Sequence, residues 1–250
     1  MKKFFWLFIT ALIVLSAFYS CKKEDTAEPP IPKNELPGTP IPENARYFFK
    51  SSVFHVSSIN AYGQSTEYKI GDAFAFFKND SDVKISAGEL TINGLPLSLE
   101  QGNYVYKKLG NFPEGVPFTG NTATWTASGD TAGVPPFSIN DNSPFPAKPV
   151  ILDKKINTQE NFLLAARDTI IADSTIFIIA GPKGSLKKVK GPNSRSCLFS
   201  KDELKTIGTG RSLGLIQISA YNTVSDTLTF PGILTFFQKQ TTASKYVDLE

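Results

Sequence analysis

Alternation of apolar and polar side chains with period two is the feature that most constrains this chain, and it recurs from residue 46 onwards. In the stretch 213–221, for example, Ile216, Ile218 and Ala220 share one face of an extended segment. Such alternation places successive side chains on opposite faces of a β-strand. No part of the sequence sustains a helical period, so the sequence predicts an all-β chain.

Turn signals divide these runs into many short strands, which is typical of β-sandwiches. Asn93-Gly94 is one such turn. We predict two Ig-like or fibronectin-like sandwich domains, over 46–147 and 148–250, separated at the proline-rich stretch 143–149. The alternative is one large sandwich or jelly roll, because all-β domains can reach this size.

One short helix is expected between strands. Ser200 and Glu203 fit a capping box, in which each side chain bonds the other residue's backbone amide. Gly208 is a plausible end for this segment. The sequence therefore predicts about two helical turns as a connector.

The first twenty residues have the profile of a signal peptide. Lys2 and Lys3 precede an apolar run over 4–18, which is short for a membrane-spanning helix of about 20 residues. The run ends at Ser20-Cys21, which resembles the cleavage site of bacterial lipoproteins, although Phe18 and Tyr19 depart from its usual residues. The resemblance implies cleavage before Cys21 and lipidation of its thiol, and hence a membrane partner. The alternative is an ordinary signal peptide with an incidental cysteine.

Residues 21–45 are predicted to form a tether between the lipid and the folded chain. The segment is rich in proline and charge, a composition that cannot bury much apolar surface and favours extended polyproline geometry. Its prolines are Pro29, Pro30, Pro32, Pro37, Pro40 and Pro42. Cys197, the second of two cysteines, has no partner if Cys21 is acylated, and we expect it to be a buried, inert thiol.

Three features together resemble secreted lipoproteins of the Bacteroidetes: charge just after Cys21, the proline-rich tether, and β-sandwich modules behind it. In that group, a lysine followed by acidic residues is similar to a surface-export signal, and Lys23, Glu24 and Asp25 match this pattern. The resemblance implies an outer-membrane lipoprotein exposed at the cell surface, with a periplasm-facing lipoprotein as the alternative. It supplies no catalytic residues.

Five Asp-Ser or Asp-Thr triplets resemble the O-glycosylation pattern of exported Bacteroidetes proteins. The acceptors would be Thr26, Thr131, Thr169, Ser174 and Thr227. The alternative is that these dipeptides mark turns and strand starts, where Asp, Ser and Thr bond the nearby backbone.

Signatures of catalysis are missing from the sequence. His55 is the one histidine, so neither a histidine cluster for metal nor a zinc motif can form, and no G-x-S-x-G elbow is present. We therefore expect no catalytic residues, no metal and no cofactor. The 26 basic residues against 23 acidic ones give no basic field, which argues against nucleic-acid binding.

Two further patterns leave alternatives open. The oxygen-rich loops 79–82 and 140–142 could bind calcium, or could be tight turns that need no ion. Tyr104, Tyr106 and Trp125 could form a sugar-stacking platform if exposed, whereas a tryptophan within such a strand is typical of a sandwich core.

The sequence thus favours a non-catalytic cell-surface lipoprotein that serves as a binding or assembly module for an unknown protein or glycan. One alternative is a glycan-binding accessory lipoprotein of polysaccharide uptake. Another is a hydrolase whose carboxylates converge only in three dimensions.

Overall fold

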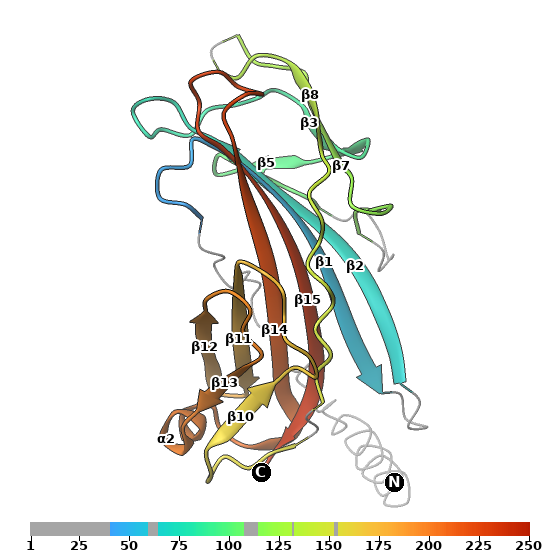
Figure 1. The fold of residues 1–250 in the computed structure, drawn as a ribbon, viewed down its shortest axis with the longest axis vertical. Coiled ribbons are helices and arrows are strands. Elements are labelled where there is room, and N and C mark those ends of the chain that lie inside the picture. Colours follow the sequence, from blue (N-terminus) through green and yellow to red (C-terminus); the bar gives the residue numbers. More distant parts are fainter. Residues whose placement is uncertain (1–40, 60–64, 108–114, 132, 153–154) are drawn as a thin grey trace, which may run out of the picture. The chain divides into compact units, whose positions relative to one another are not determined.

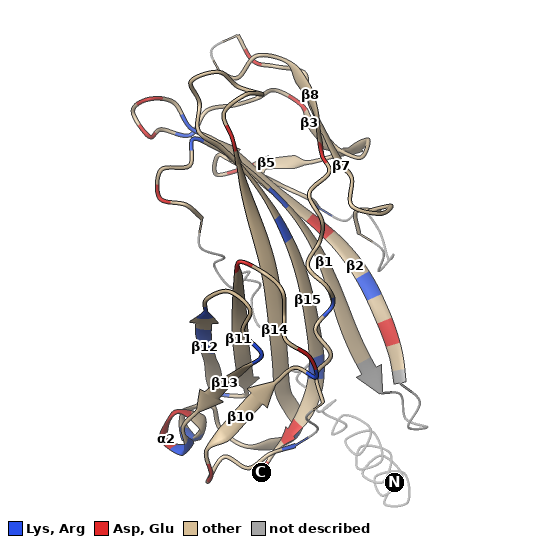
Figure 2. Ribbon diagram, viewed as in Figure 1, with Lys and Arg blue, Asp and Glu red and all other residues tan. Residues whose placement is uncertain are grey.

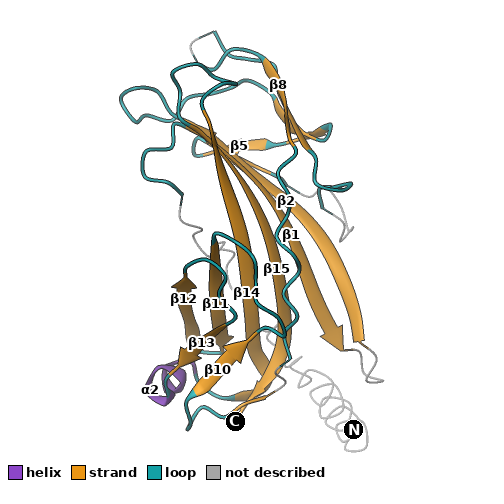
Figure 3. Cartoon of the chain, in the orientation of Figure 1, coloured by secondary structure: helices purple, strands orange, loops and turns teal. Residues whose placement is uncertain are grey.

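The computed structural model describes residues 41–59, 65–107, 115–131, 133–152 and 155–250. The described chain consists almost entirely of strands and loops, and helix is confined to α2 (Lys201–Leu204) and the 3₁₀ turn η1 (Lys205–Ile207) (Figure 3). The prediction of an all-β sandwich chain is confirmed. No helix within the described ranges is long and apolar enough to cross a membrane.

One long sheet runs through the described chain (Figure 1). Its strand order is β12-β11-β14-β15-β1-β2-β6-β5, and β9 pairs with the end of β15. Their bounds are β1 Tyr47–Ile59, β2 Ser65–Phe77, β5 Ser98–Glu100, β6 Asn103–Val105, β9 Lys155–Ile156, β11 Ser174–Gly181, β12 Gly184–Lys190, β14 Gly210–Asp226 and β15 Thr235–Leu249.

Two smaller sheets cover the same face of the long sheet, which we call the front face. One has the order β4-β3-β7-β8, and the other pairs β10 with β13 beside α2 (Figure 1). Their bounds are β3 Leu90–Ile92, β4 Leu95–Pro96, β7 Ala123–Ala127, β8 Phe137–Asp141, β10 Phe162–Ala165 and β13 Ser196–Phe199.

Each cover encloses a hydrophobic core against the long sheet. The N-terminal core contains Phe49, Phe77, Leu90, Ile92, Trp125 and Phe237 among its buried residues. The C-terminal core contains Leu164, Phe177, Phe199, Ile216, Ile218 and Val247. Phe237 and Val247 are an even number of residues apart on β15, so both cores lie on one face of that strand.

The two halves of the chain share the long sheet. β1 pairs in parallel with β15, from Tyr47 opposite Thr235 to Ser57 opposite Lys245. Phe230 and Phe237, from the C-terminal half, complete the N-terminal core. Strands from both sides of the stretch 143–149 therefore belong to one continuous sheet.

A buried cation joins the small sheet β4-β3-β7-β8 to the long sheet. The Nζ atom of Lys239 on β15 lies 3.3 Å from Oδ2 of Asp141 at the end of β8, and donates to the carbonyl of Asn121 at 2.8 Å. The same Nζ lies 4.5 Å from the centre of the Phe145 ring. Burial lowers the pKa of Lys239, and the nearby Asp141 carboxylate opposes that effect.

Local sequence signals hold in the structure. The capping box is present, with the amide of Glu203 donating to the Ser200 hydroxyl and the Glu203 carboxylate accepting from the Ser200 amide. Gly208 ends the segment with a φ of 78°, which favours glycine. Asn93 and Gly94 both have positive φ, as the predicted hairpin turn requires.

Because the sheet is continuous, we predict that damage to the C-terminal core also destabilises the N-terminal core. Leu164→Ala, in the C-terminal core, should lower the free energy of unfolding by about 2–5 kcal/mol. The measurement is urea unfolding followed by Trp125 fluorescence, in a chain starting at residue 22. Its midpoint should fall in a single transition shared with circular dichroism.

Leu163→Ala is the matched control, because Leu163 precedes Leu164 on β10 and is 54% exposed. It should change the free energy of unfolding by no more than about 0.5 kcal/mol. An unchanged Trp125 transition in Leu164→Ala, with part of the circular dichroism lost at lower urea, would contradict the shared sheet.

Candidate functional site

The face of the long sheet opposite the two cores, the reverse face, carries the most unusual side chains. On β15 these are Phe236, Gln238, Gln240 and Thr242, which alternate with the front-face residues. Register continues the face across the sheet, since Phe236 lies opposite Phe48 of β1, and Phe48 opposite Phe76 of β2. Because both smaller sheets pack on the front face, the side chains of the reverse face are not part of either core.

An aromatic cluster lies at one end of the reverse face. Phe48 stacks on Phe76 with ring centres 5.5 Å apart and planes 20° apart, and Phe74 meets Phe76 edge to face at 6.2 Å. Ala45 and Phe236 also pack in this cluster. Phe74 and Phe76 reach this face because they alternate with Ala73 and Ala75, which lie in the N-terminal core.

A groove opens over these rings, and we call it the aromatic groove. Its volume is about 330 Å³, at the lower end of the range for small-molecule pockets. Phe74 and Phe76 supply aromatic surface, and the segment 41–43 contributes further lining. The lining residues are Ile41, Pro42, Glu43, Phe74, Phe76, Lys78, Lys84 and Asn103.

Two lysines bring positive charge to the groove. The Nζ atom of Lys84 donates to Oδ1 of Asn103 at 2.7 Å and to the carbonyl of Gln101 at 3.4 Å, and it pairs with no carboxylate of the described chain. Gly102, with a φ of +74°, leaves room for the aliphatic part of the Lys84 side chain, because a Cβ at Gly102 would stand 2.7 Å from Lys84 Cδ. Lys78 donates to the exposed carboxylate of Asp82 at 2.7 Å.

A polar ladder adjoins the aromatic cluster along the middle of the reverse face. The hydroxyls of Ser219 and Thr242 share a hydrogen bond of 2.8 Å, and the amide of Gln240 donates to Thr242 at 2.9 Å. The amide of Gln238 donates to Thr223 at 3.1 Å. All of these except Thr223 are buried.

Some polar atoms of this band lack a hydrogen-bond partner among the described residues. They are the Oε1 atoms of Gln238 and Gln240 and the hydroxyl of Ser52. Buried polar groups are nearly always paired, so unpaired ones call for a functional explanation. These atoms are buried, so the band lies beneath the molecular surface.

Two opposite charges, the buried Lys50 and the half-buried Asp72, lie between the ladder and the aromatic cluster. Burial lowers the pKa of Lys50 to about 8, with the Asp72 carboxylate opposing the shift. Burial raises the pKa of Asp72 to about 6, opposed by the Ala73 amide and by Lys50. β2 carries charges of both signs along its length (Figure 2).

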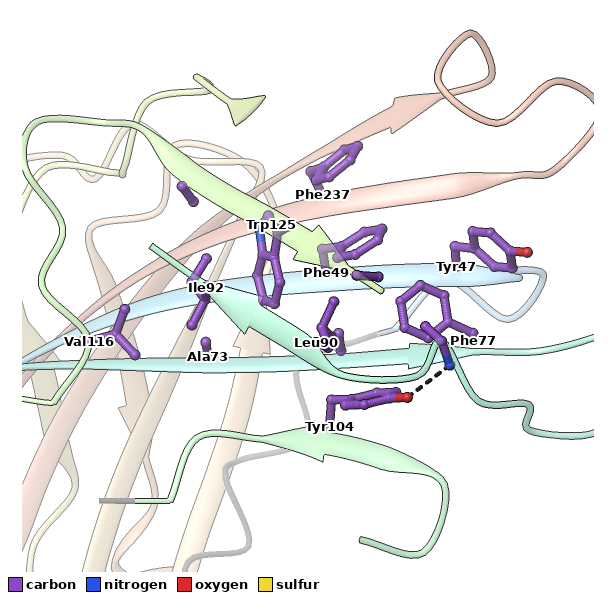
Figure 4. Close-up of a cluster of buried hydrophobic side chains, with 14 of the residues drawn as sticks. Tyr47, Phe49, Ala73, Phe77, Leu90, Ile92, Tyr104, Val116, Trp125 and Phe237 are labelled. Atoms are coloured by element: carbon purple, nitrogen blue, oxygen red, sulfur yellow. Dashed lines mark hydrogen bonds between the residues drawn. The ribbon is translucent and has the colours of Figure 1, made fainter. Parts of the chain in front are cut away.

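The aromatic residues singled out in the sequence lie elsewhere. Trp125 is fully buried in the N-terminal core beside Phe49, and Tyr104 lies in the same core (Figure 4). The Tyr104 hydroxyl accepts from the Ala87 amide and donates to the Gly88 carbonyl, both at 2.8 Å. Tyr106 is half-buried against this core. Trp125 is therefore a core residue, which is the alternative typical of a sandwich strand. Neither Tyr104 nor Trp125 exposes a ring on which a sugar could stack.

The predicted modification sites are divided by the described ranges. Cys21, Lys23, Glu24, Asp25 and Thr26 lie outside them. Thr131, Thr169 and Thr227 are exposed, and Ser174 is half-buried at the start of β11. Asp226 also serves a local turn, because its carboxylate accepts from the Leu228 and Thr229 amides.

Other candidate groups are held in local contacts. His55 bonds Glu67 at 2.8 Å, Asp80 pairs with Arg46, and the Asn79 side chain closes its own turn. Cys197 is buried, as expected, and burial raises the pKa of its thiol. The described residues contain no group of three or more His, Cys, Asp or Glu that could hold a metal ion.

Sequence reasoning missed the groove residues Phe74, Phe76 and Lys84. A signal was present in 73–77, where large aromatic residues alternate with alanines on a strand that also carries Phe77. Large apolar residues on both faces of a strand indicate that each face packs against the protein or contacts a ligand. The chain matches no known protein-family model, no curated protein and no solved structure at a significant level.

The half-buried carboxyl of Asp72 generates a pH prediction. Folding raises the pKa of this carboxyl from 3.8 to about 6, so its ionisation lowers the free energy of unfolding. This cost is absent at low pH and is fully present above pH 6. Asp72→Asn removes this cost. The unfolding free energy of the variant minus that of the wild type should therefore rise between pH 4 and 6.5, by roughly 2 kcal/mol.

Urea unfolding at a series of pH values measures this difference. Lys50 stays protonated over the same window, because its pKa of about 8 lies above it. A difference that is flat or falls with pH would show that Asp72 is not held in this buried setting.

Proposed function

We propose that this chain is a non-catalytic binding lipoprotein, carried at the outer-membrane surface by lipid on Cys21, and that it binds its ligand on the reverse face. The proposed cellular location rests on the sequence alone, because Cys21 and the export signal lie outside the described residues. The carrier domain is the all-β unit, and its ligand surface is the aromatic groove.

The observation that supports this proposal most strongly is the aromatic groove itself. It combines exposed apolar lining with polar and cationic groups on a face that neither core needs for packing. A mostly apolar hollow with a few convergent polar groups is the usual form of a ligand site.

The chemistry of the face favours a glycan as the ligand. Sugars present apolar C–H faces that pack on aromatic rings, and hydroxyls that pair with amides and side-chain hydroxyls. Phe74 supplies aromatic surface, and Asn103 and Lys84 supply an amide and an ammonium group that line the same groove. Glycan binding is therefore proposed here with different aromatic residues from those suggested by sequence.

Binding without cleavage is the form we propose. Glycoside hydrolysis needs two carboxyl groups that flank one bond. Among the described residues that line the groove, Glu43 is the single carboxylate. On the neighbouring band, Asp72 is compensated by Lys50.

The test is a printed array of neutral and acidic bacterial, plant and animal glycans, probed with the chain from residue 22. We expect the wild type to bind at least one glycan class and Phe74→Ala to lose about tenfold or more of that binding, since aromatic packing contributes about 0.5–1.5 kcal/mol beyond its buried area. The absence of any bound glycan, or binding that survives Phe74→Ala, would contradict the proposal.

Tyr246→Ala is the matched control for this array. Tyr246 is an exposed aromatic residue on the same face, near the far end of β15. The variant should bind as the wild type does, which separates loss of the groove from a general loss of aromatic surface.

The anchoring part of the proposal has its own test. In the native host, the wild-type protein should partition into a detergent phase, and Cys21→Ala should partition into the aqueous phase, because the diacyl chains supply the membrane affinity. A wild-type protein found in the aqueous phase would rule out the lipid anchor.

A further inference from the structure

We infer that the aromatic groove recognises an acidic sugar of the uronic-acid class, with the sugar carboxylate held by Lys84 and Asn103. This inference rests on the proposed function, because it names the ligand class of the same groove. It requires a cation that is not paired with a carboxylate, an apolar surface for a sugar ring, and an acceptor for sugar hydroxyls in the same groove.

Lys84 supplies the spare cation. Its ammonium group has three donors, and the described chain meets them with two neutral oxygens, those of Asn103 and Gln101. A carboxylate at this point would form a charge-assisted hydrogen bond, which is about twice as strong as a neutral one. The other groove lysine, Lys78, already pairs with Asp82.

Asn103 adds a second donor at the same place. Its Oδ1 atom accepts from Lys84, so the assignment leaves its NH₂ group as a donor beside the ammonium. Asn103 lies opposite Phe76 in the pairing of β6 with β2, which holds the amide beside the aromatic surface. Together these groups present two donors to one anionic group.

Phe74, which is half-buried, provides the aromatic surface for the sugar ring, and the buried Phe76 supports it. Their rings meet edge to face and are supported by Phe48, so their positions are fixed by packing. An apolar ring face can pack on such rings, whereas a small inorganic anion cannot use them. The combination of apolar lining and cation thus favours a ring that carries its own charge.

Glu43 adds a carboxylate to the lining of the groove. Its carboxylate lines the same groove and can accept hydrogen bonds from sugar hydroxyls. A second anionic group placed against it would be repelled. The groove therefore fits a ligand that carries one acidic group together with hydroxyls, and its volume of about 330 Å³ limits the buried part to a short saccharide.

Isothermal titration calorimetry on the chain from residue 22 tests the inference. The probes are trigalacturonate, its methyl ester, which keeps the rings and removes the charge, and benzoate, a carboxylate without a sugar. We expect trigalacturonate to bind about tenfold or more tightly than its ester, because the charge-assisted bond is lost with the charge. Benzoate should bind more weakly than trigalacturonate.

Lys84→Met should remove the preference for the acid over the ester, and Lys84→Gln provides a second variant that keeps a donor without charge. Lys183→Met is the matched control, since Lys183 is exposed in the β11–β12 turn, away from the groove. It should keep the preference intact. Circular dichroism confirms that each variant is folded.

The outcomes separate this inference from the proposed function. Equal affinity for acid and ester, or a preference that survives both Lys84 variants, overturns acidic-sugar recognition while the array result stands. Equal affinity for benzoate overturns the sugar part. Failure of every probe here, with a neutral array glycan bound through Phe74, overturns the acidic class alone.

Discussion

The parallel pairing of β1 with β15 is the constraint on which the rest of the structure depends. It joins the first and last long strands of the described chain, from Tyr47 opposite Thr235 onwards. Parallel strands need a long crossover, and here the crossover comprises most of the chain. Because β15 then passes both covers, one strand contributes Phe237 to one core and Val247 to the other.

This arrangement gives the two faces of the long sheet different tasks. The front face buries the apolar residues of both cores, which supply the dominant stabilising term in folding. The reverse face contributes to neither of these two cores, and it carries amides, hydroxyls, a compensated charge pair and an aromatic groove. A sheet with one packed face and one face of different chemistry is a common solution for antiparallel sheets, and here it extends across the parallel pairing of β1 with β15.

Local features were predictable because their signals are local. The period-two pattern of 213–221 placed Ile216 and Ile218 together, and both lie in the C-terminal core. The Ser200 capping box and the Asn93-Gly94 turn depend on neighbouring residues alone. Cys197 and Trp125 also follow the simplest reading of a residue within an alternating strand.

The shared sheet and the groove were not predictable, for physical reasons. The partner of Phe48 on β15 is Phe236, and no local pattern records a pairing between residues so far apart. Tyr104 looked as free as Tyr106, but its hydroxyl is satisfied by the Ala87 and Gly88 backbone, which only the fold brings near. The groove needs Lys84, Asn103 and Phe74 from separate strands and loops, so it exists only after folding.

Interstrand nuclear Overhauser contacts between β1 and β15 test the central claim most directly. In isotope-labelled protein, the account predicts backbone contacts in parallel register, with Phe49 beside Phe237 and His55 beside Ala243. Contacts that close 46–147 into a sheet of its own, with β15 paired to β14 alone, would contradict the shared sheet and the reverse face built on it.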